Sequence, residues 1–279
     1  MNSAAGWDCH AHLFGPYGRY PLAAERNYTP PEAVEGDYLA LLGRLGLAHG
    51  VLVHPSAYGN DYSLLFDALS RNARLRGVVV TRNATTAELR SYRAKGVRGA
   101  RFSHRSGAGA NFSGSAGLED LVRLQGSLAD AGLHAELWTD CRALPDVAAG
   151  LQELSIPLVI DHMGGFDVRA GIDDPGFRAL LGLLEGGNVW VKMCAYRNLP
   201  GIAGIAGIAG IADREAARPF HASLLRANPS RLLWGSDWPH LRVSPAPDAA
   251  QLLQWFKDWT VSAALVEQIL VDTPAALYA

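Results

Sequence analysis

The 279-residue sequence lacks the features that mark several large classes of protein. It has only three cysteines, Cys9, Cys141 and Cys194, which are too far apart for a disulfide framework or a zinc ribbon. We therefore expect them to be structural cysteines of a cytoplasmic protein. A formal net charge of −2 argues against a broad surface for nucleic acid or membrane. No basic-then-apolar leader precedes Asp8, and no apolar run approaches the roughly 20 residues of a membrane span.

Glycine-rich nucleotide loops of the GxGxxG or P-loop type are also missing, which argues against an open nucleotide-binding sheet. Short runs of Val, Ile and Leu instead alternate with segments of helical pattern. The expected strands are 7–12, 50–56, 77–82, 97–104, 134–139, 157–163, 189–195 and 232–237. The expected helices are 36–48, 61–74, 85–95, 118–131, 143–153, 175–185, 213–227 and 247–258. Eight such βα units predict an α/β protein, a single (β/α)8 TIM barrel that forms one domain over residues 1–279, with an open doubly wound sheet as the alternative.

Two segments interrupt this alternation. Residues 13–35 are rich in Pro, Gly and Tyr, and we expect them to form a long loop over the mouth of the barrel. Residues 201–212 read GIAGIAGIAGIA, and a glycine at every third position weakens both helix and strand. We expect a flexible loop there, either a lid or, as we favour, a neutral expansion.

The densest group of reactive side chains lies in Asp8-Cys9-His10-Ala11-His12. Residues i and i+2 of a strand point to the same side, so His10 and His12 would present their imidazoles together. Reactive residues of a βα barrel lie at the carboxyl ends of its strands, where His162 and Asp237 are also expected. Strands one and eight are neighbours in a closed barrel, so Asp237 would lie beside the histidine pair. This arrangement suits hydrolysis. The carboxylate can accept a proton from water, while the imidazoles, or a metal that they hold, stabilise the developing oxyanion.

Each of these residues also has a structural interpretation. The histidine pair could be satisfied within the fold, Asp237 could cap the following turn, and His162 could be a core histidine. We expect His54 and His104 to be peripheral. His134 begins its strand and would therefore lie on the opposite face of the barrel from the reactive residues.

Four segments together resemble the amidohydrolase superfamily, and more narrowly its lactonase branch, typified by the 2-pyrone-4,6-dicarboxylate lactonases. The segments are Asp8-Cys9-His10-Ala11-His12, Asp161-His162-Met163-Gly164, Trp234-Gly235-Ser236-Asp237-Trp238-Pro239-His240 and Thr273-Pro274-Ala275-Ala276-Leu277-Tyr278. The resemblance implies a hydrolase that opens the ring of a small anionic lactone in the breakdown of aromatic compounds. It further implies that Asp237 activates water while His10, His12 and His162 surround the attacked carbonyl.

The same resemblance implies which residues would bind the carboxylates of the substrate. They are Tyr28, Ser56, Arg101 and Arg197, and guanidinium groups pair with carboxylates through two parallel hydrogen bonds. The chain departs from the branch after Arg101, where Arg105 is a displaced substitute for a second arginine, and at Trp138, where a tyrosine is expected. Sulfomuconolactone and sugar-acid lactones therefore stay open as alternative substrates, in both cases with zinc.

The resemblance leaves the metal open. Most amidohydrolases complete a binuclear site with a lysine or glutamate on strand four and a histidine on strand five, whereas this chain has Arg101 and no such histidine. We expect no required metal; the alternative is one Zn²⁺ held by His10, His12, His162 and Asp237. A zinc-dependent decarboxylase of aromatic acids would use the same set, and a degenerate barrel would be a binding protein without activity. The sequence is compatible with a homo-oligomer.

Overall fold

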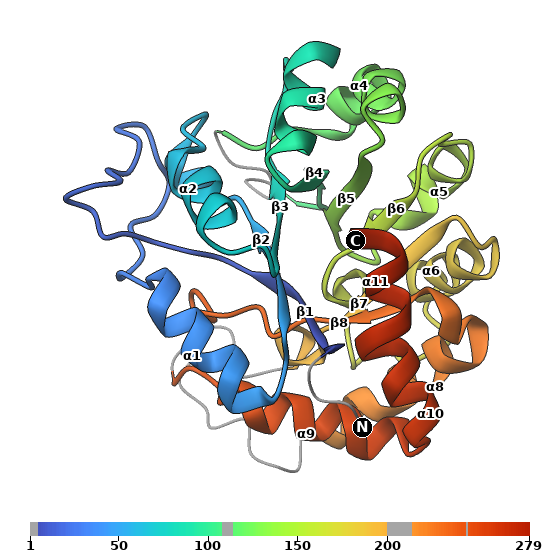
Figure 1. Cartoon of the computed structure of the whole chain (residues 1–279). Helices are drawn as coiled ribbons and strands as arrows, with labels where there is room; N and C mark the ends of the chain where they lie inside the picture. The colour runs from blue at the N-terminus through green and yellow to red at the C-terminus, as the bar shows by residue number, and fades with distance from the viewer. Residues whose placement is uncertain (1–4, 108–113, 200–213, 244) are drawn as a thin grey trace.

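The computed structural model describes residues 5–107, 114–199, 214–243 and 245–279, and the GIA segment at 201–212 lies outside them. Eight strands form one sheet in chain order, each hydrogen-bonded in parallel to the next (Figure 1). They are β1 (Trp7–Ala11), β2 (His49–Val53), β3 (Leu75–Val79), β4 (Val97–His104), β5 (His134–Thr139), β6 (Leu158–Ile160), β7 (Val189–Met193) and β8 (Leu232–Trp234). All eight expected strands are present.

The sheet closes between its first and last strands. The backbone N–H of Asp237 donates to the carbonyl of His10, and the N–H of His12 donates to the carbonyl of Trp238, each over 2.8 Å. Ala11 and Trp238 also form a parallel bridge. These bonds confirm the predicted (β/α)8 barrel and place residues that are more than two hundred positions apart side by side.

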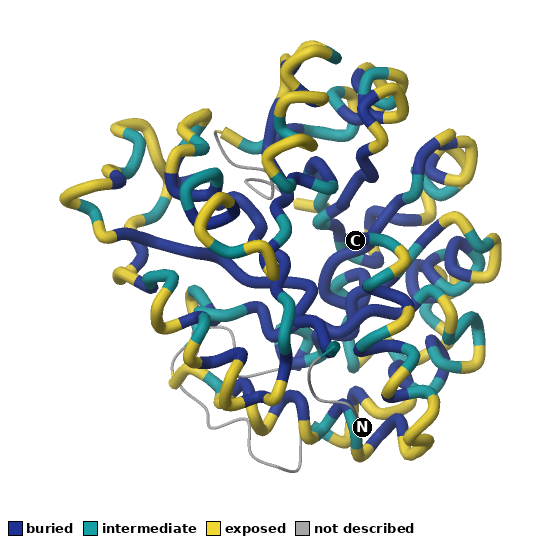
Figure 2. The backbone as a smooth tube through the Cα atoms, in the orientation of Figure 1, coloured by how far each residue is buried: buried dark blue, intermediate teal, exposed yellow. Residues whose placement is uncertain are grey.

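The helices surround the sheet, and the strands between them are buried (Figures 1 and 2). The helices are α1 (Glu35–Leu45), α2 (Ser63–Arg71), α3 (Thr86–Ala94), α4 (Leu118–Ala131), α5 (Leu144–Gln152), α6 (Pro175–Glu185), α8 (Arg218–Ala227) and α9 (Ala249–Thr260). Local sequence explains their starts: Thr85 and Glu88 form a capping box on α3, and Asp174 accepts from the N–H of Phe177 at the start of α6. No helix of the described residues has the length and apolar character to cross a membrane.

Three short elements follow α9 that the sequence patterns did not predict. They are α10 (Ala263–Glu267), a short π-helix (Gln268–Asp272) and α11 (Thr273–Tyr278). Tyr278 is fully buried, its ring 6.0 Å from that of Trp7, in a small apolar cluster with Val51 and other inward side chains of the strands. This C-terminal segment therefore covers the amino-terminal end of the barrel, opposite the strand ends that carry the candidate site.

Six strands, β1, β2, β3, β6, β7 and β8, end one to three residues earlier than predicted. At the candidate site, β6 ends at Ile160 rather than 163, and β8 ends at Trp234 rather than 237. The chain turns sharply after each, with positive φ at His162 (51°) and Asp237 (58°), a conformation that is uncommon for residues other than glycine. The candidate site residues therefore stand on tight turns just beyond the strands.

Candidate active site

A cavity of about 760 Å³ opens at the carboxyl ends of the strands. Nine of the ten site residues predicted from the sequence line it: His12, Tyr28, Ser56, Arg101, Arg105, Trp138, His162, Arg197 and Asp237. The tenth, His10, is fully buried directly behind His12. The long loop 13–35 contributes Tyr28 to this wall, in agreement with its expected place at the barrel mouth.

The two histidines of the first strand converge, as their spacing predicts. Nε2 of His10 lies 3.3 Å from Nε2 of His12, and each of these nitrogens lies 3.6 Å from Oδ1 of Asp237. Nδ1 of His12 lies 2.8 Å from the carbonyl oxygen of Val53. Since a carbonyl only accepts, that nitrogen carries the ring proton and Nε2 of His12 presents a lone pair.

Asp237 is held by its other oxygen. Oδ2 accepts hydrogen bonds from the hydroxyl of Tyr196 and from Nε of Arg197, whereas Oδ1 has no hydrogen-bond partner among the described residues. Burial opposes ionisation of this carboxyl, but the guanidinium of Arg197 holds its pKa well below the ordinary value. Asp237 is therefore a carboxylate at neutral pH, with one oxygen available beside the histidine pair.

His162, on the turn that follows β6, completes the group. Its ring lies 4.8 Å from that of His10, centroid to centroid, and its Nδ1 has no hydrogen-bond partner among the residues that the structure describes. Burial lowers the pKa of His162 well below 6.5, so the ring is neutral. A neutral imidazole that lines the cavity and has an unused nitrogen can donate to or accept from a bound molecule.

A cluster of buried charges lies beneath these residues. Nζ of Lys192 lies 2.6 Å from Oε2 of Glu136, 3.1 Å from Nδ1 of His10 and 3.2 Å from Oδ1 of Asp161. Lys192, Glu136 and Asp161 are all fully buried. We call these four residues the inner cluster; Oδ2 of Asp161 also accepts from Nε of Arg101 over 2.7 Å, which connects the cluster to the cavity.

The sequence interpretation missed Lys192 and Glu136. The available signal was a charged residue inside an apolar strand, in Val-Trp-Val-Lys-Met and His-Ala-Glu-Leu-Trp. Charged side chains in such strands are buried only when they are paired. His134, expected on the opposite face, contacts Oε1 of Glu136 at 3.4 Å and so lies below the inner cluster rather than in the cavity.

The cavity wall carries an excess of positive charge. Six arginines line it against three carboxylates; the arginines are Arg101, Arg105, Arg142, Arg169, Arg197 and Arg242, and the carboxylates are Asp140, Asp167 and Asp237. We call this lining the arginine pocket. The guanidinium of Arg105 lies 4.5 Å from the ring centre of Trp138, and that of Arg242, which the sequence did not indicate, lies 5.0 Å from that of Tyr28. Stacking on an aromatic ring orients a guanidinium.

The spacing of the donor atoms fits one zinc ion. Nε2 of His10, Nε2 of His12 and Oδ1 of Asp237 are separated by 3.3, 3.6 and 3.6 Å. Ligand atoms of a tetrahedral site with bonds of 2.0–2.1 Å lie about 3.3 Å apart. The carbonyl of Val53 would hold His12 in the required tautomer, as partners of metal-bound histidines commonly do.

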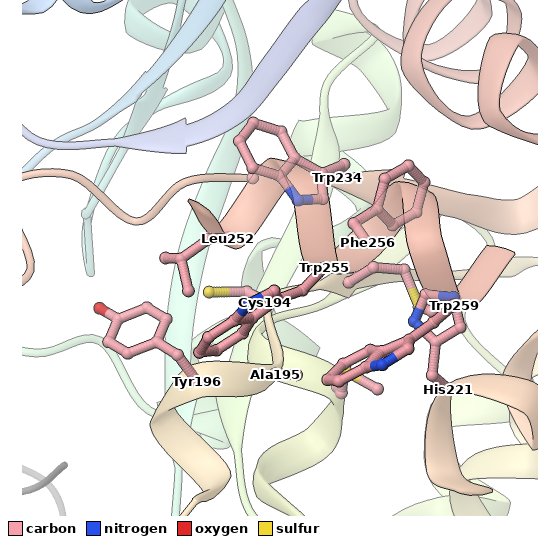
Figure 3. Close-up of a pocket in the computed structure, with 12 residues that line it drawn as sticks. Cys194, Ala195, Tyr196, His221, Trp234, Leu252, Trp255, Phe256 and Trp259 are labelled. Carbon is pink, nitrogen blue, oxygen red and sulfur yellow. The ribbon is translucent and has the colours of Figure 1, made fainter. Parts of the chain in front are cut away.

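A second, much smaller cavity lies beside β7 and α9 (Figure 3). Its volume of about 20 Å³ is enough for a single water. Figure 3 shows Trp234, Phe256, Trp259 and Cys194 around it, and His221 bonds Thr260 at its edge. Burial raises the pKa of Cys194 well above the ordinary value, which agrees with the expected structural role of the cysteines.

The barrel has paired histidines at the end of β1 and an aspartate after β8, as amidohydrolases do. The chain belongs to that family: the family model described as "Amidohydrolase" matches residues 7–279. The chain is 35% identical to 4-sulfomuconolactone hydrolase of Rhizobium radiobacter over 281 residues, which cover 98% of this chain and 89% of that protein. It is 33% identical to 2-pyrone-4,6-dicarboxylate hydrolase of Comamonas testosteroni over 279 residues, covering 99% and 90%. The crystal structure of a candidate 2-pyrone-4,6-dicarboxylic acid hydrolase from Pseudomonas putida superimposes with a TM-score of 0.82 at 33% identity, covering 99% of this chain and 97% of that one.

Proposed function

We propose that this protein hydrolyses the ring ester of a small lactone that carries at least one further anionic group, in the breakdown of aromatic compounds. The observation that carries the proposal is the position of Asp237, an ionised carboxylate with one unused oxygen at the base of the arginine pocket. Relatives with similar sequences act on lactones with sulfonate or carboxylate groups, as their names state. Both groups are anions that guanidinium binds well.

In the proposed reaction, Oδ1 of Asp237 accepts a proton from a water molecule while the water oxygen attacks the lactone carbonyl. The charge that develops on the carbonyl oxygen is stabilised by the imidazole of His162 and by the guanidinium of Arg101. Nε2 of His10 and Nε2 of His12 lie on the other side of Oδ1 of Asp237, each 3.6 Å from it. When the ring C–O bond breaks, the proton passes from Asp237 to the leaving oxygen, and the product is an open-chain acid.

The arginine pocket would orient the lactone for this attack. Arg105 and Arg242, stacked on Trp138 and Tyr28, lie on the wall where the anionic substituents would bind, and Ser56 adds a hydroxyl. If one Zn²⁺ is bound, His10, His12 and Asp237 would hold it, and it would supply Lewis-acid activation of the carbonyl or of water. The proposed proton transfers involve the water molecule, Asp237 and the leaving oxygen of the lactone.

The first test is hydrolysis of 2-pyrone-4,6-dicarboxylate and of 4-sulfomuconolactone, followed by ultraviolet absorbance, with chelator-treated protein whose metal content is measured alongside. We expect turnover of at least one of them, and galactarolactone serves as a lactone without an aromatic origin. Failure with every lactone, together with release of CO₂ from an aromatic acid, would overturn the proposal in favour of a decarboxylase.

A further inference from the structure

Asp140 is a negatively charged residue in the wall of a pocket that would bind anions. It directly follows β5, lines the cavity and has a side chain that is 15% exposed. Of the three carboxylates in the arginine pocket, Asp237 is the proposed proton acceptor and Asp167 pairs with the exposed Arg169. Asp140 has neither role, yet a carboxylate at this place repels an anionic ligand. Its hydrogen bonds show what it contributes instead.

The carboxylate of Asp140 joins two loops at the carboxyl ends of β4 and β5. Its Oδ2 accepts from the backbone N–H of Ser106 over 2.9 Å, and its Oδ1 accepts from the hydroxyl of Ser106 over 2.8 Å. Oδ1 also accepts from the N–H of Ala143, just before α5, over 3.2 Å. Because both oxygens bond Ser106, the loop after β4 is fastened to the end of β5.

Ser106 follows directly after Arg105, so this anchor fixes the backbone from which the arginine extends. Nε of Arg105 lies 4.0 Å from Oδ2 of Asp140, and its guanidinium lies 4.5 Å from the ring centre of Trp138. Burial, together with repulsion by neighbouring guanidiniums, lowers the pKa of Arg105, and Asp140 opposes this effect. Those guanidiniums belong to Arg101, Arg197 and Arg242. Without an anchor, their repulsion and the rotamer freedom of a long side chain would favour an Arg105 that turns out to solvent.

A local role in starting α5 does not explain these contacts. The bond from Ala143, three residues further along the chain, would suffice to stabilise the turn before that helix. The two bonds from Ser106 are shorter, and they join residues that are 34 positions apart. They therefore serve the loop that carries Arg105 rather than the helix.

We propose that Asp140 is a positioning residue that holds Arg105, through Ser106, in the orientation in which the guanidinium binds an anionic group of the ligand. The inference rests on the proposed function, because it names the residue that sets anion selectivity in the same pocket. It reverses the expectation from charge alone. Removal of a negative charge from an anion site should strengthen binding, whereas removal of Asp140 should weaken it because Arg105 is then no longer held in place.

The sign of this effect is tested with isophthalate, a planar ring that carries two carboxylates and no ester bond. Its dissociation constant is measured by titration calorimetry with the native full chain and with Asp140→Ala. We expect the constant to rise about 10-fold in the variant, the effect of losing one hydrogen bond to a charged group. The matched control is Asp167→Ala, which removes the same charge from the same pocket. The partners of Asp167, Arg142 and Arg169, are 75% and 78% exposed, so binding should tighten in this variant.

Two further variants separate positioning from charge. Ser106→Ala removes a hydrogen bond to Asp140 without altering any charge, and it should weaken isophthalate binding by less than Asp140→Ala does. Ser106 is exposed, so the change should not disturb folding. In an Arg105→Met background, Asp140→Ala should cause no further weakening, because the residue through which it acts is absent. With a lactone that the native chain hydrolyses, Asp140→Ala should raise KM about 10-fold while kcat changes little.

The position of Arg105 is measured without any ligand. In 15N-arginine-labelled protein, the Nε–H signal that disappears in Arg105→Met identifies this residue. The indole ring of Trp138 should shift this signal in the native chain away from the position typical of an exposed arginine. In Asp140→Ala the shift should be lost as the side chain turns out to solvent, whereas in Asp167→Ala it should remain.

Isophthalate binding that is unchanged or tighter in a folded Asp140→Ala variant would overturn the inference, and so would an unchanged Arg105 signal. Further weakening by Asp140→Ala in the Arg105→Met background would also contradict it, because the effect would then not pass through Arg105. If Asp140→Ala does not fold, unchanged binding and an unchanged Arg105 signal in Ser106→Ala decide against it in the same way. If the native chain binds no isophthalate and hydrolyses no lactone, the proposed function fails, and the Arg105 signal still decides whether Asp140 holds this side chain.

Discussion

The inner cluster and the arginine pocket are adjacent in the barrel but carry charge in different ways. In the inner cluster the side chains of Lys192, Glu136 and Asp161 have no exposure to solvent, and each charge faces a partner. In the arginine pocket, by contrast, the side chain of Arg105 is 33% exposed and that of Arg169 is 78% exposed, and arginines outnumber carboxylates.

This difference follows from the cost of removing charges from water. A fully buried ion is stable only with close partners, so Lys192 faces both Glu136 and Asp161, while Arg101 from the pocket pairs with the second oxygen of Asp161. A guanidinium near solvent needs no fixed partner and remains available for an incoming anion. Under the proposed function, the inner cluster would hold the reacting groups in place and the arginine pocket would select the ligand.

The largest expected effect comes from Asp237, the carboxylate that contacts residues of both regions. Asp237→Asn removes the proton acceptor and should lower kcat/KM for the lactone by about 10³-fold, within the range for loss of a general base. The asparagine is nearly isosteric, so thermal unfolding should change little. A folded variant that retains full activity would contradict the proposed mechanism.

The need for charge pairing in the inner cluster is tested by removing its lysine. Lys192→Met leaves Glu136 and Asp161 without their shared cation and should reduce the free energy of unfolding by about 3–5 kcal/mol, measured by urea denaturation. The matched change in the arginine pocket, Arg169→Met, breaks only an exposed ion pair with Asp167 and should cost less than about 1 kcal/mol. Equal losses in the two variants would show that the two regions do not differ as described.

Ligand selection by the arginine pocket is tested at Arg105. Arg105→Met should raise KM for a dianionic lactone by about 10–100-fold, the effect of losing a hydrogen bond to a charged group, with a smaller effect on kcat. Stability should be nearly unchanged, since the side chain is partly exposed. An unaltered KM would place the anionic groups of the substrate elsewhere on the wall, with Arg242→Met as the next variant.

The last prediction concerns a histidine outside both regions. Burial lowers the pKa of His221 to about 4, whereas a histidine of the unfolded chain titrates near 6.5. As the pH falls, the unfolded state therefore binds a proton first, and the stability present above pH 6.5 is lost progressively down to pH 4. Between pH 7 and pH 5 this amounts to about 2 kcal/mol, and His221→Gln should lose that much less on acidification in urea titrations.

Local patterns were sufficient for much of the fold. The strand 97–104 and the helices 118–131 and 175–185 have the bounds that the sequence predicts, because hydrophobic periodicity and, for the last helix, the start signal at Asp174 act within a few residues. The early ends of β6 and β8 depend on positive φ angles at His162 and Asp237, which only surrounding contacts stabilise. The assignment of the whole chain to one domain, its oligomeric state and the role of the GIA segment stay predictions.

The candidate site, like the fold, could be predicted from the sequence only in part. The HxH spacing and the ring closure of eight strands predict that His10, His12 and Asp237 meet, and they do so within 3.6 Å. The roles of these residues in catalysis stay proposals. Nothing local indicates that Arg242 would contribute to the pocket, since its place depends on a loop after the last strand.

The sequence by itself determined the eight βα units, the family and the residue types at the strand ends, since these depend on periodicity and on short motifs. Only the tertiary structure decided that Lys192 of β7 meets Glu136 of β5 and His10 of β1 inside the barrel. The physical reason is that pairing across a closed barrel depends on strand tilt and register, which bring together side chains that no short stretch of sequence relates.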